Sequence, residues 1–182
     1  MTAAASEQHS ANALPPMVVF SHGSDSGPVG TKINALAAVA ERHGCAWVSI
    51  DYRGIADPTA RVHKLVAERQ ASWGRPILVG SSLGAHVCTA ASVALNARSL
   101  FLMAPAFYMP GFAALTPTPH ACPVTLVHGW WDDVVPVSHS VRFANTHHSY
   151  LHILPGDHRL TEQLAEIEIL FAQHLRRDGV CG

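Results

Sequence analysis

The order of apolar segments along the chain limits the possible folds most strongly. Six short segments are nearly continuous apolar runs, which is typical of strands buried on both faces. These runs cover residues 17–21, 46–50, 76–79, 99–103, 124–127 and 150–154. Segments with helical spacing of apolar residues follow most of them, at 31–43, 58–73, 83–96, 137–145 and 161–175. This alternation predicts an α/β protein with a doubly wound, mostly parallel six-stranded sheet and helices on both faces.

The length and composition indicate one domain. The chain has 182 residues, of which 48% are hydrophobic, enough for a substantial core. We expect this domain to span residues 17–176, between a flexible N-terminal tail (1–16) and a C-terminal tail (177–182). Residues 1–16 lack the features of a secretory signal.

The charge balance gives no reason to expect a nucleic acid or a membrane as partner. The formal net charge is −1, and a basic surface is what would attract polyanions. No apolar run approaches the roughly 20 residues of a membrane span. We therefore expect a small molecule as the partner, and the sequence predicts no oligomeric state.

Cysteine and histidine usage bears on compartment and metal binding. The chain has four cysteines, Cys45, Cys88, Cys122 and Cys181, and none form a C-x-x-C pair. We expect reduced thiols and a cytoplasmic protein. Thirteen histidines are unusual, and His147, His148 and His152 lie close together. Their spacing matches no known site, so we expect no metal.

A G-x-S-x-G pentapeptide, residues 80–84, lies between the third apolar run and the following helix. A serine on such a sharp strand-to-helix turn is held clear of the sheet with its hydroxyl exposed. Side chains in place of the two glycines would clash with the neighbouring helix and strand. Ser82 is therefore the candidate nucleophile, and the presence of its chemical partners must decide whether the motif is more than chance.

A serine nucleophile needs a base to take its proton and a carboxylate to orient that base. His158 follows the last apolar run, where Gly156 permits a turn that brings the imidazole over the sheet edge. Asp132, Asp133 and Asp157 are the candidate carboxylates. We favour Asp132 because Asp157 adjoins His158, and neighbouring side chains usually diverge. Asp133 is expected to face solvent or to cap the next helix.

Attack on an acyl carbon creates an oxyanion, which fixed N–H donors must stabilise. The backbone N–H of Leu83, directly after Ser82, is one candidate donor, and the dipole of its helix adds positive potential there. The second donor is expected in the loop after the first strand. The backbone N–H of Ser24 is the candidate in that loop.

With these motifs in order, residues 17–175 resemble the α/β-hydrolase superfamily. Five segments carry the resemblance: Ser-His-Gly at 21–23, Asp-Tyr-Arg-Gly at 51–54, the pentapeptide, His-Gly-x-x-Asp-x-x-Val-Pro at 128–136, and Gly-Asp-His at 156–158. The resemblance implies a catalytic triad of Ser82, Asp132 and His158, an acyl-enzyme intermediate and no cofactor. Arg53 is expected to pair with a nearby carboxylate.

The interval from 104 to 122 is too short for the helical cap that many superfamily members insert. We therefore expect a minimal α/β-hydrolase fold without a cap domain and with an open site. Five aromatic residues either line an acyl pocket or pack in the core, and the sequence leaves both open. They are Phe107, Tyr108, Phe112, Trp130 and Trp131.

The leading functional hypothesis is a serine hydrolase that cleaves a small carboxylic ester or thioester. Two alternatives use the same fold. One is a non-catalytic interaction domain, and the other is an acyltransferase or perhydrolase with the same three residues.

Overall fold

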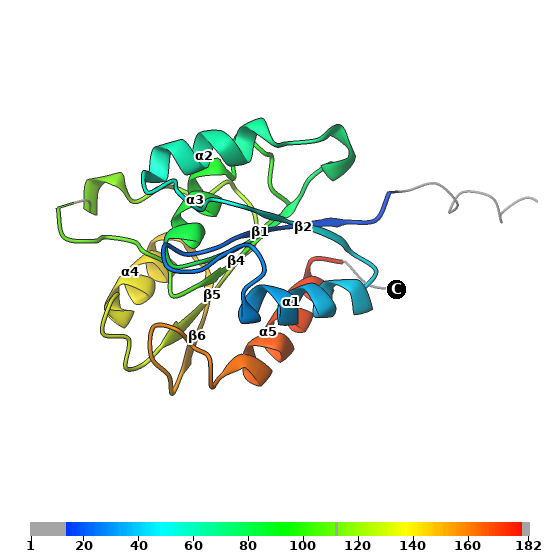
Figure 1. Ribbon diagram of the computed structural model, residues 1–182. Helices are drawn as coiled ribbons and strands as arrows, with labels where there is room; N and C mark the ends of the chain where they lie inside the picture. Colours follow the sequence, from blue (N-terminus) through cyan, green and yellow to red (C-terminus); the bar gives the residue numbers. More distant parts are fainter. Residues whose placement is uncertain (1–13, 112, 180–182) are drawn as a thin grey trace, which may run out of the picture.

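The computed structural model describes residues 14–111 and 113–179, arranged around a single central sheet (Figure 1). The strand order is β2-β1-β3-β4-β5-β6, and every neighbouring pair is parallel. Most of the predicted N-terminal tail (residues 1–13) and residues 180–182 of the predicted C-terminal tail lie outside the described residues. The predicted doubly wound, parallel six-stranded fold is confirmed.

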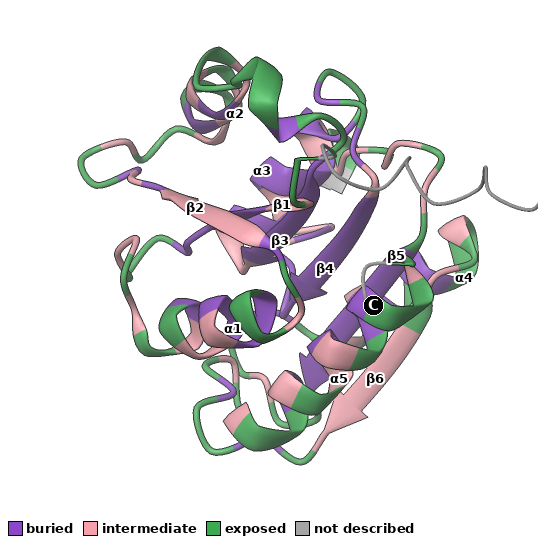
Figure 2. Cartoon of the chain, turned by 90° about the vertical axis from the view of Figure 1, so that its right-hand side faces the viewer, coloured by how far each residue is buried: buried purple, intermediate pink, exposed green. Residues whose placement is uncertain are grey.

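The strands coincide closely with the predicted apolar runs. They are β1 (Met17–Ser21), β2 (Ala46–Ile50), β3 (Ile77–Ser81), β4 (Ser99–Met103), β5 (Val124–Gly129) and β6 (Tyr150–Leu154). Figure 2 shows β4 buried along its length and the edge strands β2 and β6 only partly buried. Parallel strands covered by helices on both faces have no wet side, which explains their continuous apolar sequences.

Five α-helices cover the two faces of the sheet (Figure 1). They are α1 (Thr31–Arg42), α2 (Pro58–Ala67), α3 (Leu83–Ala91), α4 (Val137–His147) and α5 (Leu164–Arg177), with short 3₁₀ turns η1 (Ala71–Trp73) and η2 (Ala113–Leu115). Residues of α1 and α5 share one buried cluster, and residues of α2, α3 and α4 share the other. The sheet therefore has a separate apolar core on each face.

Each core joins a central strand to its covering helices. On one face, the ring of Phe101 in β4 lies 5.1 Å from that of Phe171 in α5. On the other face, Leu102 lies in the same buried cluster as Leu65 of α2 and Phe143 of α4. Burying one such side chain contributes roughly 1.5–3 kcal/mol, so these contacts anchor the strand ends that carry the polar loops.

Two helices end earlier than their sequence pattern predicts. Helix α2 ends at Ala67, and Trp73 reaches the core from the separate turn η1. Helix α3 ends at Ala91, where the hydroxyl of Ser92 donates to the carbonyl of Thr89 and accepts from the N–H of His120. A serine side chain that bonds nearby backbone groups competes with helix continuation.

The sheet topology determines where polar loops meet. From β1 the chain passes to β2 on one side, and β3 then pairs with β1 on the other side, with Ser21 opposite Gly80. Such a switch point opens a crevice at the carboxyl ends of the strands. The loop after β1 and the turn after β3 therefore adjoin.

No cap covers this edge within the part of the chain that the structure describes. Between β4 and β5 the described residues form only the short turn η2 and irregular loop. The predicted capless fold is confirmed. Among residues 14–111 and 113–179, no helix has the length and apolar character that crossing a membrane requires.

Candidate active site

Ser82 occupies a sharp turn between β3 and α3. Its backbone has φ 54° and ψ −119°, a region that residues other than glycine rarely adopt. The N–H of Ser82 donates to the carbonyl of Met103 at 2.9 Å, and its carbonyl accepts from Ala85 and Ala106 at 3.0 and 3.2 Å. These bonds hold the backbone of Ser82 in this strained conformation, which persists only where the surrounding structure fixes it.

The two glycines of the pentapeptide permit the close packing of this turn. A Cβ atom at Gly80 would lie 2.5 Å from the Cα of Ala85 in helix α3. A Cβ atom at Gly84 would overlap the carbonyl oxygen of Ser21 at the end of β1. Each glycine therefore allows a helix to approach a strand closely, as the motif predicts.

The structure brings Ser82, His158 and Asp132 together in one hydrogen-bonded chain. His158 Nδ1 lies 2.7 Å from Asp132 Oδ2, and His158 Nε2 lies 3.0 Å from Ser82 Oγ. Because a carboxylate only accepts, Nδ1–H donates to Asp132, and the lone pair of Nε2 faces the serine hydroxyl. This geometry positions the imidazole to accept the proton of Ser82.

Asp132, and neither of the other candidate aspartates, contacts His158. Its side chain is fully buried, and its Oδ1 accepts from the backbone N–H groups of Val134 and Val135 at 2.9 and 2.7 Å. Asp133 is exposed, and Asp157 Oδ1 accepts from the N–H groups that follow it in its own loop. The Asp132 carboxylate is thus held in one orientation.

His128 is a further part of this site that the sequence interpretation missed. Its Nε2 lies 3.0 Å from Asp132 Oδ2 and 2.9 Å from the carbonyl oxygen of Val135, so Nε2–H donates to both. Its Nδ1 lies 2.7 Å from Ser140 Oγ. Burial lowers the pKa of His128, which favours the neutral ring. Its place at the start of the 128–136 motif, four residues before Asp132, was the available signal.

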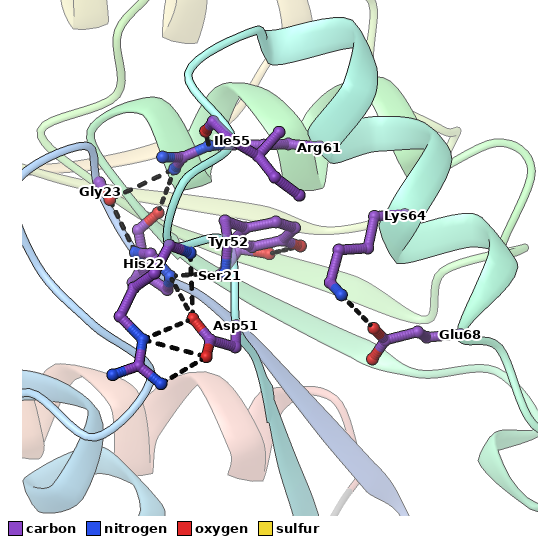
Figure 3. Close-up of polar contacts among 10 residues, drawn as sticks. Ser21, His22, Gly23, Asp51, Tyr52, Ile55, Arg61, Lys64 and Glu68 are labelled. Carbon is purple, nitrogen blue, oxygen red and sulfur yellow. Dashed lines mark hydrogen bonds and ion pairs between the residues drawn. The ribbon is translucent and has the colours of Figure 1, made fainter.

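The loop after β1 is fixed by the side chain of its first residue (Figure 3). His22 is buried, and its Nδ1–H donates to the carbonyl oxygen of Gly23 at 2.7 Å. Its Nε2 accepts from the backbone N–H of Tyr52 at 2.9 Å. Burial lowers the pKa of His22, and the neutral ring satisfies both contacts. The motif after β2 therefore supports the loop after β1.

Arg61 of helix α2 holds the same loop and was also missed. It is 3% exposed, and its Nη1 lies 3.3 Å from the carbonyl oxygens of both His22 and Gly23 (Figure 3). Its Nε donates to the carbonyl of Ile55 at 2.7 Å. In a planar trans peptide the C=O and N–H point in opposite directions. Binding the Gly23 carbonyl therefore directs the N–H of Ser24 away from Arg61.

Both predicted oxyanion donors lie near Ser82. Leu83 begins helix α3, where an N–H has no acceptor within the helix. The loop after β1 borders the nucleophile, because a Cβ atom at Gly23 would lie 3.5 Å from Ser82 Cβ. Ser24 follows Gly23 and is exposed. The arrangement leaves both N–H groups as candidates for binding an oxyanion.

Arg53 pairs with a carboxylate, as predicted. Its Nη2 lies 2.6 Å from Asp51 Oδ2, and its Nε lies 3.0 Å from both oxygens. Hydrogen bonds from Arg53 lower the pKa of Asp51 to about 2. The pair is exposed, so it orders the loop after β2 with little net stabilisation.

The aromatic residues whose role the sequence left open differ in their surroundings. Phe107 is fully buried and stacks on Phe143 with ring centroids 4.2 Å apart, so it belongs to the core. Tyr108 lies under Arg142. Trp130 and Trp131, directly before Asp132, are 59% and 65% exposed. The fifth, Phe112, lies outside the described residues.

The structure also bears on the expectations for metal binding and for the cysteines. Among the described residues, no group of three or more His, Cys, Asp or Glu side chains is arranged to hold a metal ion. Cys88 is buried against the sheet, and burial raises the pKa of its thiol to about 12. It therefore packs as an apolar residue and is not a reactive thiol.

Comparisons with solved structures agree with this architecture. A protein from Xanthomonas campestris pv. campestris, whose name assigns it to the alpha/beta hydrolase superfamily, has 28% identity and a TM-score of 0.82, covering 89% of this chain and 98% of its own. An alpha-beta serine hydrolase homologue from Coxiella burnetii has 22% identity and a TM-score of 0.72, with coverages of 88% and 85%.

A third similar structure, again from Xanthomonas campestris, is described as a serine hydrolase without a lid. It has 18% identity and a TM-score of 0.72, and the alignment covers 91% of this chain and 83% of that one. No protein-family model and no curated protein matches the chain. In its fold and in the solved structures that it matches, the chain is similar to the α/β-hydrolase superfamily, and this similarity supports a hydrolase.

Proposed function

We propose that this protein is a serine hydrolase that cleaves a small carboxylic ester or thioester through Ser82, His158 and Asp132. The observation that carries the proposal is the continuous chain of hydrogen bonds through the three side chains, 3.0 Å and 2.7 Å long. A base oriented by a carboxylate and facing a serine hydroxyl is the arrangement that activates a serine nucleophile.

In the proposed reaction, Ser82 Oγ attacks the acyl carbon while His158 Nε2 takes its proton. The backbone N–H groups of Leu83 and Ser24 stabilise the oxyanion. The imidazolium then gives its proton to the leaving alcohol or thiol, and an acyl-enzyme forms. Water, deprotonated by His158, attacks the acyl carbon in turn, and Ser82 leaves as the free hydroxyl.

The surroundings of the site support a small substrate. His158 is 17% exposed, and the described residues include no cap over it. An open site suits a short acyl group, or one that a larger molecule presents. Trp130 and Trp131 are the exposed apolar side chains next to Asp132, and we propose that they contact the acyl or leaving group.

We also propose a reducing compartment, the cytoplasm, as the location. Cys88 and Cys122 are free thiols, and burial raises the pKa of Cys122 to about 11. A thiol with a raised pKa reacts slowly with disulfides. The proposed partner is the small-molecule substrate, with no nucleic acid, membrane or cofactor.

Turnover of p-nitrophenyl esters of increasing acyl length tests the proposal. Wild-type protein should hydrolyse the short esters, and Ser82→Ala should reduce kcat/KM by about 10⁴-fold or more. Ser99→Ala, which removes a buried serine hydroxyl at the start of β4, is the matched control for the loss of a serine and should retain most of the activity. Folded wild-type protein without turnover of any ester or thioester would instead favour an interaction domain.

A further inference from the structure

Lys32 lies at the base of the site and has no part in the reaction described above. It is the second residue of α1, and its Nζ donates to Ser81 Oγ at 2.9 Å. Ser81 is the last residue of β3 and directly precedes Ser82. The ammonium therefore contacts the turn that holds the nucleophile, from the face of the sheet covered by α1.

This lysine differs from an ordinary surface lysine. Lys32 and Lys64 are the two lysines of the sequence. Lys64 Nζ forms an exposed ion pair with Glu68 at 2.9 Å. Lys32 Nζ instead donates to a neutral group, the hydroxyl of Ser81. Burial lowers the pKa of Lys32 to about 8, against the opposing charges of Asp157 and Asp132. Partial burial of an ammonium without a contacting carboxylate destabilises a fold.

Resting on the proposed function, we propose that Lys32 is a positioning residue of the nucleophile. Its ammonium fixes the Ser81 hydroxyl, and through it the end of β3 that leads into the turn at Ser82. A hydrogen bond from a charged donor is stronger than one between neutral groups. Its loss should misplace Ser82 Oγ relative to His158 Nε2 and so slow the attack step.

Four variants test this role through kcat and KM for p-nitrophenyl acetate at pH 7. Lys32→Met should lower kcat by about tenfold with little change in KM. Lys32→Arg keeps a charged donor and should retain most of the activity. Ser81→Ala removes the acceptor of the same hydrogen bond, so it should lower kcat to a similar extent. Lys64→Met is the control for loss of a lysine elsewhere.

Thermal unfolding of the same variants separates a positioning role from a structural one. Because the partly buried ammonium is destabilising, Lys32→Met should unfold at the same temperature as wild type or higher, despite its lower kcat. A lower unfolding temperature together with an unchanged kcat of the folded protein would overturn the inference. Wild-type protein that shows no esterase activity would contradict the proposed function itself, so the two failures are distinguishable.

Discussion

Two networks of hydroxyl, imidazole and carboxylate groups lie at opposite ends of the sheet. At the carboxyl ends of the strands, Ser82 contacts His158, which contacts Asp132. At the amino ends, His174 lies 2.9 Å from both Ser99 and Thr125, and Asp178 lies 3.0 Å from Ser99. We call the second set the buried network, comprising Ser99, Thr125, His174 and Asp178. The same side-chain types serve both ends.

The order of the groups and their exposure distinguish the candidate active site from the buried network. In the buried network the imidazole lies between two hydroxyls, the carboxylate touches a hydroxyl, and His174 is 2% exposed. Burial lowers the pKa of His174 to about 3. At the site, the carboxylate orients the imidazole, and the serine sits on a strained turn. Residue types alone therefore do not define a reactive site; a carboxylate-oriented base beside an accessible hydroxyl does.

The largest expected effect comes from the carboxylate that orients the base. Asp132→Asn should reduce kcat/KM by about 10⁴-fold. The amide oxygen would keep accepting from Val134 and Val135, so the NH2 would face His158 Nδ1, donate to it and favour the wrong tautomer. Asp133→Asn is the matched control on the neighbouring exposed aspartate and should leave turnover unchanged. Ester hydrolysis at pH 8 measures both. Equal effects of the two changes would contradict the role of Asp132 as the carboxylate that orients His158.

An intermediate effect is expected from the arginine that holds the loop after β1. Arg61→Met should lower kcat by about 10–100-fold with little change in KM, because a misplaced oxyanion donor mainly weakens the transition state. Arg53→Met, which removes the exposed arginine of the loop after β2, provides the control. Steady-state kinetics on folded protein separate kcat from KM. A rise in KM alone would contradict a role in oxyanion stabilisation.

The smallest effect on activity is expected from a change in the buried network. The same change should have a clear effect on the pH dependence of stability. A folded-state pKa of about 3 for His174 lies below its ordinary value, so protons bind the unfolded chain more tightly. The free energy of unfolding should therefore be highest above about pH 6.5 and fall by about 1.4 kcal/mol per pH unit from this residue as pH decreases toward 3. His174→Gln should show a shallower decline and near-normal turnover at pH 8.

Urea unfolding between pH 7 and pH 4 measures this dependence. His63→Gln, a change of an exposed histidine in α2, should retain the wild-type slope. Identical slopes for wild type and His174→Gln would show that the buried imidazole does not titrate as its surroundings require.

The sequence was sufficient for features that depend on chain order. Ser82, Asp132 and His158 each follow a predicted strand, and parallel strands present their carboxyl ends at one edge, so their convergence was foreseeable. The contacts of Arg61 and Lys32 were not foreseeable, because each joins elements far apart in the chain. His128 contacts only nearby residues, and its role was missed because its sequence position does not show that its ring turns toward Asp132. The ends of α2 and α3 were also missed, since the contact of Ser92 with His120 is tertiary.

The central claim is that Ser82, and not another serine, is the activated nucleophile. Reaction with a fluorophosphonate followed by peptide mass spectrometry tests it most directly. We expect one phosphonylated residue, Ser82, with labelling abolished in Ser82→Ala and retained in Ser99→Ala. Folded protein that stays unlabelled at pH 8, or that carries the label on a different serine, would contradict the assignment of Ser82 as the nucleophile.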